Sequence, residues 1–547
     1  MSKKLKFDDD AKEKLADGME KVCRAVQTTL GPKGNNVAIE RSFGTPSVLH
    51  DGVSIAKEIE LEDKFENLGA SLIIEAAQKT NDVAGDGTTT ATILAKAITK
   101  ESLKNIAAGA NPMILRKGIE KAVDVVSKRL KEISRPVKKD QEIIDVATIS
   151  AQDKEIGDII GTAIEKLGRD CVIAVEEGKS TNIQVEYKEG MEFSKGLQSP
   201  LLVTDKETGE SVMEDVHILI TDQKIDSMPE LVSFFQKKIN PLIQAKSLKS
   251  LLVIADEVSG QCLANFVLNH IQGAFKVAIV GIPGFGDQKN EVLDDMAIAT
   301  GGATISSVIG SKISEMEDED FGRATKVIST KNNTVIIGGG GDQKMIDERI
   351  EQIKAQIEKS EDDFSRERLE ERLAKLTSGI AVINVGANSE AEMREKKERC
   401  IDAISATKAA ISEGIVVGGE LALTYASDGL DKLESDLSGD EATGVGIIRE
   451  ALEAPFEALM ENSGYSYGRM KERVADREYP MTIDVMDGKI KDGFKSGIVD
   501  SVKVSISALQ NAASIAIMVM TTNCLIVEDK KDEPQGAAQA PGIPMRV

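Results

Sequence analysis

Helical patterns occupy both ends of this chain and flank a middle part of different character. Residues 1 to about 135 contain long amphipathic stretches, such as 65–80 and 112–133, in which apolar residues recur at helical spacing. Between residues 190 and 379, short apolar runs alternate with helical patterns, which is typical of α/β structure. Helical patterns return after residue 390. Helical ends around an α/β middle predict an inserted domain.

The middle part contains the clearest strand candidates. The apolar runs lie at 217–221, 250–255, 276–282 and 334–337. A charged helical hairpin is expected next, with isoleucines at 350, 353 and 357 on one arm. Further along, a helical pattern is expected over 500–527, and residues 528–547 are rich in Pro, Gly, Ala, Gln and charge, which predicts a disordered tail.

Length, composition and charge limit the classes of protein to which this chain can belong. A length of 547 residues suggests about three to four domains. Aromatic residues make up only 3% and tryptophan is absent, so the cores must be built mainly from Ile, Leu, Val and Ala. The formal net charge of −23 opposes binding to nucleic acid or to anionic lipid. We therefore expect a soluble, self-associating protein.

Cysteine, histidine and hydropathy patterns exclude several other classes. The five cysteines and three histidines are dispersed, so reduced thiols are expected, and neither a zinc site nor a Ser-His-Asp triad is supported. The start of the chain has no apolar segment of the kind found in signal peptides, and the apolar stretch 512–520 is too short to span a bilayer. The expectation is a cytoplasmic protein without a membrane segment.

The stretch from Gly85 to Thr90 reads Gly-Asp-Gly-Thr-Thr-Thr and runs directly into an apolar helical pattern. Glycines allow close approach of a ligand, and the first turn of a helix offers unpaired N–H groups and a positive dipole end. Asp86 could hold the Mg²⁺ of a nucleotide. The alternative is an ordinary turn before a well-capped helix, and for this stretch alone that reading is favoured.

A second glycine loop, residues 28–34, strengthens the first interpretation. It reads TTLGPKG and follows a predicted helix over 11–26, and the acidic turn at Asp51 lies between the two loops. The chain contains no G-x-x-x-x-G-K-[ST] sequence, so an ordinary P-loop fold is disfavoured.

Together these motifs resemble those of the group I chaperonins, the GroEL-type proteins. The matching segments, in chain order, are TTLGPKG (28–34), DGVSIAKEIELED (51–63), AGDGTTTATILA (84–95), AGANPM (108–113), EGMEF (189–193), PGFGD (283–287), RLAKLTSGIAVINVGA (372–387), DAISATKAAISEGIVVGG (402–419) and SALQNAAS (507–514). Short glycine-rich motifs are weak singly, but so many in one order make chance similarity very unlikely.

The resemblance implies a multidomain α and α/β fold, a GroEL-like three-domain subunit. The all-helical equatorial domain would comprise 1–135 and 414–527, the small intermediate domain 136–189 and 380–413, and the α/β apical domain 190–379, followed by the tail 528–547. Hinges would lie at Pro136 with Gly414 and at Gly190 with Gly379. The alternative for each hinge residue is an ordinary break between elements.

The resemblance also implies ATP hydrolysis with Mg²⁺ and K⁺ as cofactors. Asp86 would hold Mg²⁺, Asp402 would orient or deprotonate the attacking water, and Asp51 ranks below Asp402 for that role. Thr29 and His50 would offer backbone carbonyls to K⁺. The remaining nucleotide contacts would come from Leu30, Gly31, Pro32, Gly87, Thr88, Thr89, Thr90, Gly418, Gly419, Asp484, Val485 and Asp500.

Several positions depart from the family's pattern. His50 stands where the family usually has lysine, Gln152 replaces an asparagine, and Glu420 replaces the third glycine of a run. The segment 197–202 lacks the aromatic residues that the family often has there. A glycine run at 338–341 follows a predicted strand and could be mistaken for a dinucleotide loop, but it is interpreted as a loop of the apical domain.

Two apolar stripes in the middle part suggest a binding surface. Such stripes ordinarily belong to a core, but the chaperonin resemblance assigns Val232, Phe235, Leu263, Val267 and Leu268 to the capture of non-native polypeptides. The implied partners are identical subunits in heptameric rings, usually stacked in pairs, and a GroES-type cochaperonin. Two alternatives are a diverged relative that binds specialised clients without a full lid-dependent cycle and, with little support, a metabolic ATP-dependent transferase.

Overall fold

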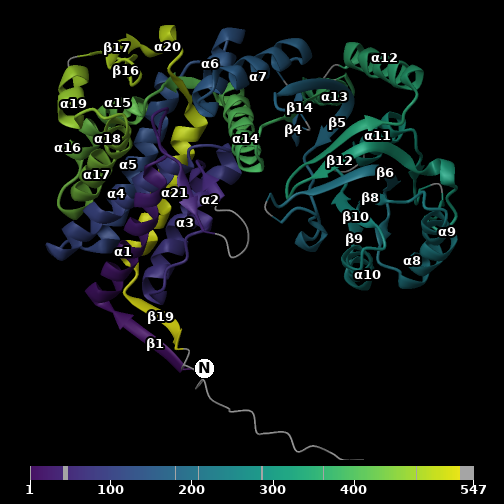
Figure 1. Ribbon diagram of the computed structural model, residues 1–547, viewed down its shortest axis with the longest axis horizontal. Coiled ribbons are helices and arrows are strands. Elements are labelled where there is room, and N and C mark those ends of the chain that lie inside the picture. Colours follow the sequence, from purple (N-terminus) through teal and green to yellow (C-terminus); the bar gives the residue numbers. More distant parts are fainter. Residues whose placement is uncertain are drawn as a thin grey trace, which may run out of the picture. The chain divides into compact units, whose positions relative to one another are not determined.

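The computed structural model describes residues 2–40, 47–169, 171–178, 180–206, 208–284, 288–308, 310–360, 363–377, 379–475 and 477–529 (Figure 1). The chain divides into two compact units. Unit 1 comprises Met1–Gly161 and Asn388–Val547, and unit 2 comprises Thr162–Ala387. Both ends of the chain therefore contribute to one unit, and the middle forms the other.

Unit 1 is mainly helical. Its helices are α1 (Asp8–Gln27), α2 (Gly52–Lys57), α3 (Lys64–Ala84), α4 (Thr88–Ala107), α5 (Pro112–Ile133), α6 (Asp140–Ala151), α14 (Glu390–Glu413), α15 (Leu421–Ala426), α16 (Leu430–Asp436), α17 (Asp440–Ala451), α18 (Ala454–Asn462), α19 (Tyr467–Ala475), α20 (Gly493–Ser496) and α21 (Val502–Thr521). Its strands are β1 (Ser2–Phe7), β2 (Val37–Ile39), β3 (Ser47–Leu49), β15 (Ile415–Val417), β16 (Met481–Asp484), β17 (Lys489–Asp492), β18 (Val499–Ser501) and β19 (Cys524–Asp529). Helix α7 (Lys154–Leu167) crosses the boundary between the units.

Helix α21, from the C-terminal part of the chain, lies among the N-terminal helices of unit 1. It packs against α3, α4 and α5, and α1 packs against α3 and α4 (Figure 1). The shared core consists mostly of Ala, Val, Leu and Ile, as the shortage of aromatic residues requires. Among the described residues, α21 is the one helix long and apolar enough to cross a membrane by length and composition, and it extends well beyond the apolar stretch 512–520. Just over half of its apolar window is buried inside the protein. The expectation of no membrane segment stays a prediction.

The end of the described chain corrects a second expectation. Helix α21 ends at Thr521, and residues 524–529 form β19, which pairs antiparallel with β1 from Ser2↔Asp529 to Phe7↔Cys524. Leu525 and Val527 are buried whereas Ile526 is 58% exposed, which is the alternation of a strand with one buried face. The predicted helix over 500–527 therefore overran, and Glu528 and Asp529 belong to a strand. Residues 530–547 lie outside the described residues.

In the described part of unit 2, nine strands form one sheet with the order β10-β8-β6-β12-β13-β5-β14-β4 and with β11 beside β6. The strands of unit 2 are β4 (Val172–Glu177), β5 (Gln184–Phe193), β6 (Ser211–Thr221), β7 (Lys224–Ile225), β8 (Ser250–Ala255), β9 (Glu257–Val258), β10 (Lys276–Gly281), β11 (Thr304–Ile305), β12 (Gly322–Ser329), β13 (Thr334–Gly339) and β14 (Gly379–Val385). Its helices are α8 (Met228–Phe234), α9 (Asn240–Gln244), α10 (Gly260–Ile271), α11 (Gln288–Thr300), α12 (Gln343–Lys359) and α13 (Asp363–Thr377), with a π-helix at Phe235–Ile239.

The four predicted strands all lie in this sheet, and their apolar runs are explained by burial on both faces. In β8, Leu251 and Val253 pack into a core with residues of α8 and α10, whereas Leu252 and Ile254 pack into a second core with residues of α11. Because helices cover both faces, successive residues are all apolar. Figure 1 shows the sheet between these helices.

Each predicted hinge pair lies side by side. In unit 1, Arg135 and Ile415 exchange backbone hydrogen bonds of 2.9 and 2.8 Å, so Pro136 and Gly414 are neighbours. In unit 2, Gly379 pairs with Glu189, and Gly190 packs against Ile380. The predicted intermediate domain is not a separate compact unit, because α6 and α14 belong to unit 1 whereas β4, β5 and β14 belong to unit 2. The three-domain boundaries and the hinge movements remain predictions.

The glycine run at 338–341 is explained by packing. A Cβ on Gly339 would lie 2.2 Å from the carbonyl oxygen of Ala299, and one on Gly341 would lie 2.2 Å from that of Ile298. The side chain of Asp342 then caps α12 by accepting from the amide of Lys344. The run joins β13 to α12 and lets both approach α11, as a structural loop would.

Candidate functional site

The first glycine loop joins α3 to α4 in a tight turn. Helix α3 ends at Gly85, with φ 68°, and α4 begins after Gly87, with φ 82°. Both angles lie in the left-handed region that favours glycine. A Cβ on Gly85 would also lie 2.1 Å from the Cβ of Ser405 on α14, and one on Gly87 would lie 2.5 Å from a methyl of Val504 on α21. Segments from both ends of the chain therefore close around this turn.

The first turn of α4 has the features of an anion-binding helix start. Its N-cap is Gly87, so no side chain satisfies the amides of the first turn. The hydroxyls of Thr88 and Thr89 lie 2.8 and 2.6 Å from the position that a Cβ on Gly52 would occupy, so only a glycine fits after Asp51. This packing brings the α2 turn against the threonines.

Asp86, the predicted metal ligand, points into this turn. Its carboxylate accepts hydrogen bonds from the Ser150 hydroxyl at 2.6 Å and from the Gly87 amide at 2.5 Å. Burial raises the pKa of Asp86, the two hydrogen bonds oppose that rise, and the charge of Asp51 adds to it. A divalent cation beside Asp86 would remove this electrostatic cost.

Asp402 lies on α14, close enough to Asp51 and Asp86 to interact electrostatically with both. Burial raises its pKa well above the usual range, and the negative charges of Asp51 and Asp86 raise it further. Asp51 itself caps α2 by accepting from the amides of Val53 at 3.3 Å and Ser54 at 2.7 Å. The structure thus gathers residues 51, 86 and 402 around one turn, and a carboxyl with a raised pKa is suited to accept a proton.

Asp500 and Glu420 approach from the C-terminal part of unit 1. Asp500 lies on β18 opposite Val416 of β15, and Glu420 follows β15 immediately before α15. Burial raises the pKa of Asp500 well above its usual range, and the charges of Glu420 and Asp86 contribute. Burial and the charge of Asp86 raise the pKa of Glu420 to about 7, even though the Thr90 hydroxyl donates a hydrogen bond to it at 2.7 Å.

The second glycine loop lies next to the first. The hydroxyls of Thr29 and Thr89 are 3.4 Å apart. The Asn462 side chain holds the loop by donating to the carbonyl of Leu30 at 3.0 Å, and Gly31 packs against Leu459. Its neighbour Pro32 continues the same turn. The predicted contacts Thr29, Leu30, Gly31 and Pro32 therefore belong to one loop, which lies beside Thr89.

The remaining predicted contacts are arranged around β15 to β17. The Thr482 hydroxyl donates to the carbonyl of Gly418 at 2.9 Å and also lies against Gly419. Asp484 forms an ion pair of 2.6 Å with Lys491, and Val485 is buried in an apolar cluster with Leu459 and Phe456. Asp484 is therefore already paired, which distinguishes it from Asp500.

His50 and Gln152, two positions that depart from the family's pattern, contact each other. The imidazole Nε2 lies 3.2 Å from Oε1 of Gln152, and Nδ1 lies 2.9 Å from Oδ1 of Asn36. Burial lowers the pKa of His50, with a contribution from the charge of Arg399. The two replacements thus form a matched pair, and a neutral imidazole joins the start of α2 to the end of α6.

Among the described residues, no group of three or more Asp, Glu, His or Cys side chains forms a ready-made metal cage. Mg²⁺ bound to a nucleotide does not need one, because it takes one or two carboxylates and fills its other positions with phosphate and water oxygens. The buried carboxylate of Asp86 beside a helix start fits such an ion.

Residue-by-residue reasoning missed two partners in this site. The sequence assigns no role to Ser150 and shows Glu420 only as a departure from the family's pattern, yet Ser150 donates a hydrogen bond to Asp86 and Glu420 accepts one from Thr90. A hydroxyl at the end of one helix and an acid after a glycine pair carry no signal by themselves. Their role depends on which distant segment they face.

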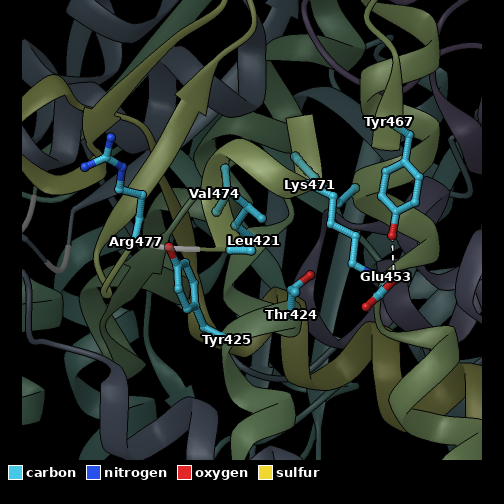
Figure 2. Close-up of a pocket in the computed structure, with 10 residues that line it drawn as sticks. Leu421, Thr424, Tyr425, Glu453, Tyr467, Lys471, Val474 and Arg477 are labelled. Carbon is cyan, nitrogen blue, oxygen red and sulfur yellow. Dashed lines mark hydrogen bonds and ion pairs between the residues drawn. The ribbon is translucent and has the colours of Figure 1, made fainter. Parts of the chain in front are cut away.

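A cavity of about 200 Å³ lies in the C-terminal part of unit 1. Leu421, Tyr425, Phe456 and Val474 line it, and Figure 2 shows the Tyr467 hydroxyl directed at Glu453 on one side. The cavity contains none of the predicted nucleotide contacts.

The predicted client-binding residues of unit 2 differ in their exposure to solvent. Val232 on α8 is 43% exposed and Leu268 on α10 is 52% exposed, whereas Phe235 and Leu263 are half-buried. Val267 is only 8% exposed and packs in the core, so its assignment to an exposed surface is corrected, because it faces the sheet. Ile271, one helical turn from Leu268, is 65% exposed and extends the apolar surface.

Three features together define a chaperonin-type subunit. Both ends of the chain form one helical unit, the middle of the chain forms an inserted α/β unit, and acidic side chains surround the start of α4. The sequence profile of the TCP-1/cpn60 chaperonin family matches residues 22–530. The chain therefore belongs to the TCP-1/cpn60 chaperonin family.

Solved structures agree with this fold. The chain is similar to two crystal forms of the chaperonin gp146 from the bacteriophage EL 2 (Pseudomonas aeruginosa), both obtained in the presence of ATP-BeFx. In form II the TM-score is 0.68 and the sequence identity is 21%, and in form I the values are 0.62 and 20%. Each match covers 96% of this chain and 99% of the phage chaperonin.

Proposed function

We propose that this chain is the subunit of an ATP-driven chaperonin that binds non-native polypeptides and promotes their folding. One observation supports the proposal most strongly. The turn containing Asp86 leads into α4, whose first turn has no side-chain cap, and the acidic residues around this turn come from both ends of the chain. The phage chaperonin of similar fold was crystallised in the presence of an ATP analogue, which supports a nucleotide at this site.

In this proposal each part of the site has a distinct task. The first-turn amides of α4 and the hydroxyls of Thr88 and Thr89 bind phosphate oxygens, and Asp86 holds Mg²⁺, which neutralises charge on the phosphates. Asp402 positions the attacking water and accepts its proton, for which the raised pKa is suited. We also propose that the backbone carbonyls of Thr29 and His50 bind K⁺.

The apolar surface defined by Val232, Leu268 and Ile271 would hold non-native polypeptide. Binding of ATP can release a client only if the nucleotide binds more tightly to a conformation with that surface withdrawn. Heptameric rings, a GroES-type cochaperonin and a cytoplasmic location complete the proposal.

Asp402→Ala tests the catalytic part. The variant is expected to lose about 100-fold or more in kcat for phosphate release, because proton acceptance from water is removed. Its affinity for Mg²⁺-ATP should stay the same or increase, since a buried negative charge is lost. Glu120→Ala, which removes an exposed acid on α5, is the matched control. Undiminished phosphate release by Asp402→Ala would refute the assigned role.

A second candidate is a ring that binds clients without a lid-dependent cycle. Glu420 in the site and the segment 197–202, which contains no aromatic residue and exposes 60% of Leu201, favour it. Refolding of a stringent client separates the two, because ATP hydrolysis without any gain in yield from a cochaperonin would support this second function.

A further inference from the structure

Glu420 is held in the nucleotide site against two unfavourable conditions. Its backbone has φ 62°, in the left-handed region that disfavours residues with a Cβ. Glu420 is half-buried near Asp86 and Asp500, so like charges oppose ionisation of its carboxyl group. A position that combines strain with buried like charge is a candidate for a functional role.

The partner of Glu420 is one of the threonines that start α4. Oε1 accepts the Thr90 hydroxyl hydrogen bond at 2.7 Å, and the residues come from segments 330 positions apart in the chain. Thr90 is the third residue of α4, and its hydroxyl and amide belong to the turn that would meet phosphate. While Glu420 accepts this bond, the hydroxyl cannot donate to a phosphate oxygen.

We propose that Glu420 competes with the phosphates of ATP for the Thr90 hydroxyl and thereby sets the nucleotide affinity of this chaperonin. The inference rests on the proposed nucleotide site. Glu420 acts in two ways, because it occupies the hydroxyl in the nucleotide-free state and places a negative charge beside the incoming phosphates. Binding of Mg²⁺-ATP requires the carboxylate to release Thr90, and Mg²⁺ offsets part of the remaining repulsion.

Two substitutions separate the two effects. Glu420→Gln removes the charge but keeps an acceptor oxygen for Thr90. Glu420→Gly removes both, and glycine fits the observed φ without strain. Because removal of one negative charge beside the phosphates is worth roughly a tenfold change in affinity, we expect about tenfold tighter Mg²⁺-ATP binding for Glu420→Gln. The gain should be larger for Glu420→Gly, which also frees the Thr90 hydroxyl. Glu120→Gln on the exposed face of α5 is the control for loss of one charge and should not change affinity.

The experiment is calorimetric titration of the assembled protein and each variant with Mg²⁺-ATP, Mg²⁺-ADP and AMP. The proposal predicts that the gain falls in that order, because repulsion depends on the number of phosphate charges. In a Thr90→Val background the extra gain of Glu420→Gly over Glu420→Gln should disappear, since no hydroxyl remains to compete for, whereas the gain from loss of the charge should persist. Equal affinities of wild type and both Glu420 variants, or an equal gain for all three nucleotides, would overturn it.

Failure of the proposed function gives a different result. If neither the wild type nor any Glu420 variant binds Mg²⁺-ATP while all retain wild-type circular dichroism and assembly, the nucleotide site itself is refuted. If the wild type binds and the variants bind no tighter, the site stands and the competition by Glu420 is refuted.

Discussion

The candidate nucleotide site of unit 1 and the apolar surface of unit 2 depart from the usual distribution of residues in opposite directions. Unit 1 gathers the half-buried carboxylates of Asp86, Asp402 and Asp500, whose pKa values are all raised, and unit 2 exposes Leu268 and Val232. Buried charge and exposed apolar surface both cost stability, and both are more informative than ordinary core or surface. In each unit the costly feature coincides with a region to which chaperonin resemblance assigns a function.

The two regions also differ in how their residues are assembled. The acids of unit 1 come from segments more than 300 positions apart, whereas the apolar surface comes from two helices close in sequence, α8 and α10. A change in one acid should therefore affect a whole network of charges. A change in one exposed apolar residue should act locally.

The largest effect in this comparison is expected from Val232→Ser combined with Leu268→Ser. Both side chains are exposed, so the fold should be kept while apolar contact area is lost. We expect about tenfold weaker binding of a chemically denatured polypeptide, from roughly 1.5 kcal/mol of lost contact. Fluorescence anisotropy of a labelled client measures it, and hydrolysis of ATP should be unchanged.

Val267→Ser provides the contrast for that prediction. Val267 is buried against the core, so its replacement should lower the thermal stability of unit 2. If Val267→Ser weakens client binding without loss of stability, or if the double variant binds clients as tightly as the wild type, the distinction between core and surface on these helices is wrong.

A smaller effect is expected from pH. The pKa of Glu420 is raised to about 7 in the folded state, from an ordinary value near 4.5. The folded state therefore binds the proton more tightly than the unfolded state, so stability falls as pH rises from about 4.5 to about 7. Glu420→Gln removes this loss, and its apparent Tm should exceed that of the wild type by about 2 °C or more at pH 7.5.

At pH 5 the same difference should be much smaller, because Glu420 of the folded wild type is then mostly protonated and is neutral like the glutamine of the variant. Differential scanning fluorimetry of the nucleotide-free assemblies at both pH values checks this. If Glu420→Gln raises the apparent Tm by the same amount at both pH values, the destabilisation does not come from ionisation of Glu420, and this prediction is wrong.

The sequence was most informative where a pattern is local. The spacing of apolar residues predicted α5 at Pro112–Ile133 and β8 at Ser250–Ala255 with the bounds observed. It failed at residues 524–529, because a short strand after an apolar helix continues the same hydropathy and only the distant partner β1 decides its conformation.

The candidate site was predictable only in part for the same reason. The turn around Asp86 has a local signature, but Asp402 looks like any acid on a charged helix, and family resemblance alone pointed to it. Ser150 and Glu420 acquire their roles through contacts with segments far away in sequence. Such contacts are properties of the fold rather than of a motif.

The most direct test of the account is the affinity of a denatured polypeptide for the assembled protein with and without Mg²⁺-ATP. Coupling between the two sites predicts that Mg²⁺-ATP weakens client binding by about tenfold in the wild type, within the usual range for linked sites. Asp86→Ala, which lacks the proposed Mg²⁺ ligand, should show no such change. Equal client affinity with and without Mg²⁺-ATP in a wild-type protein that binds the nucleotide would contradict the account.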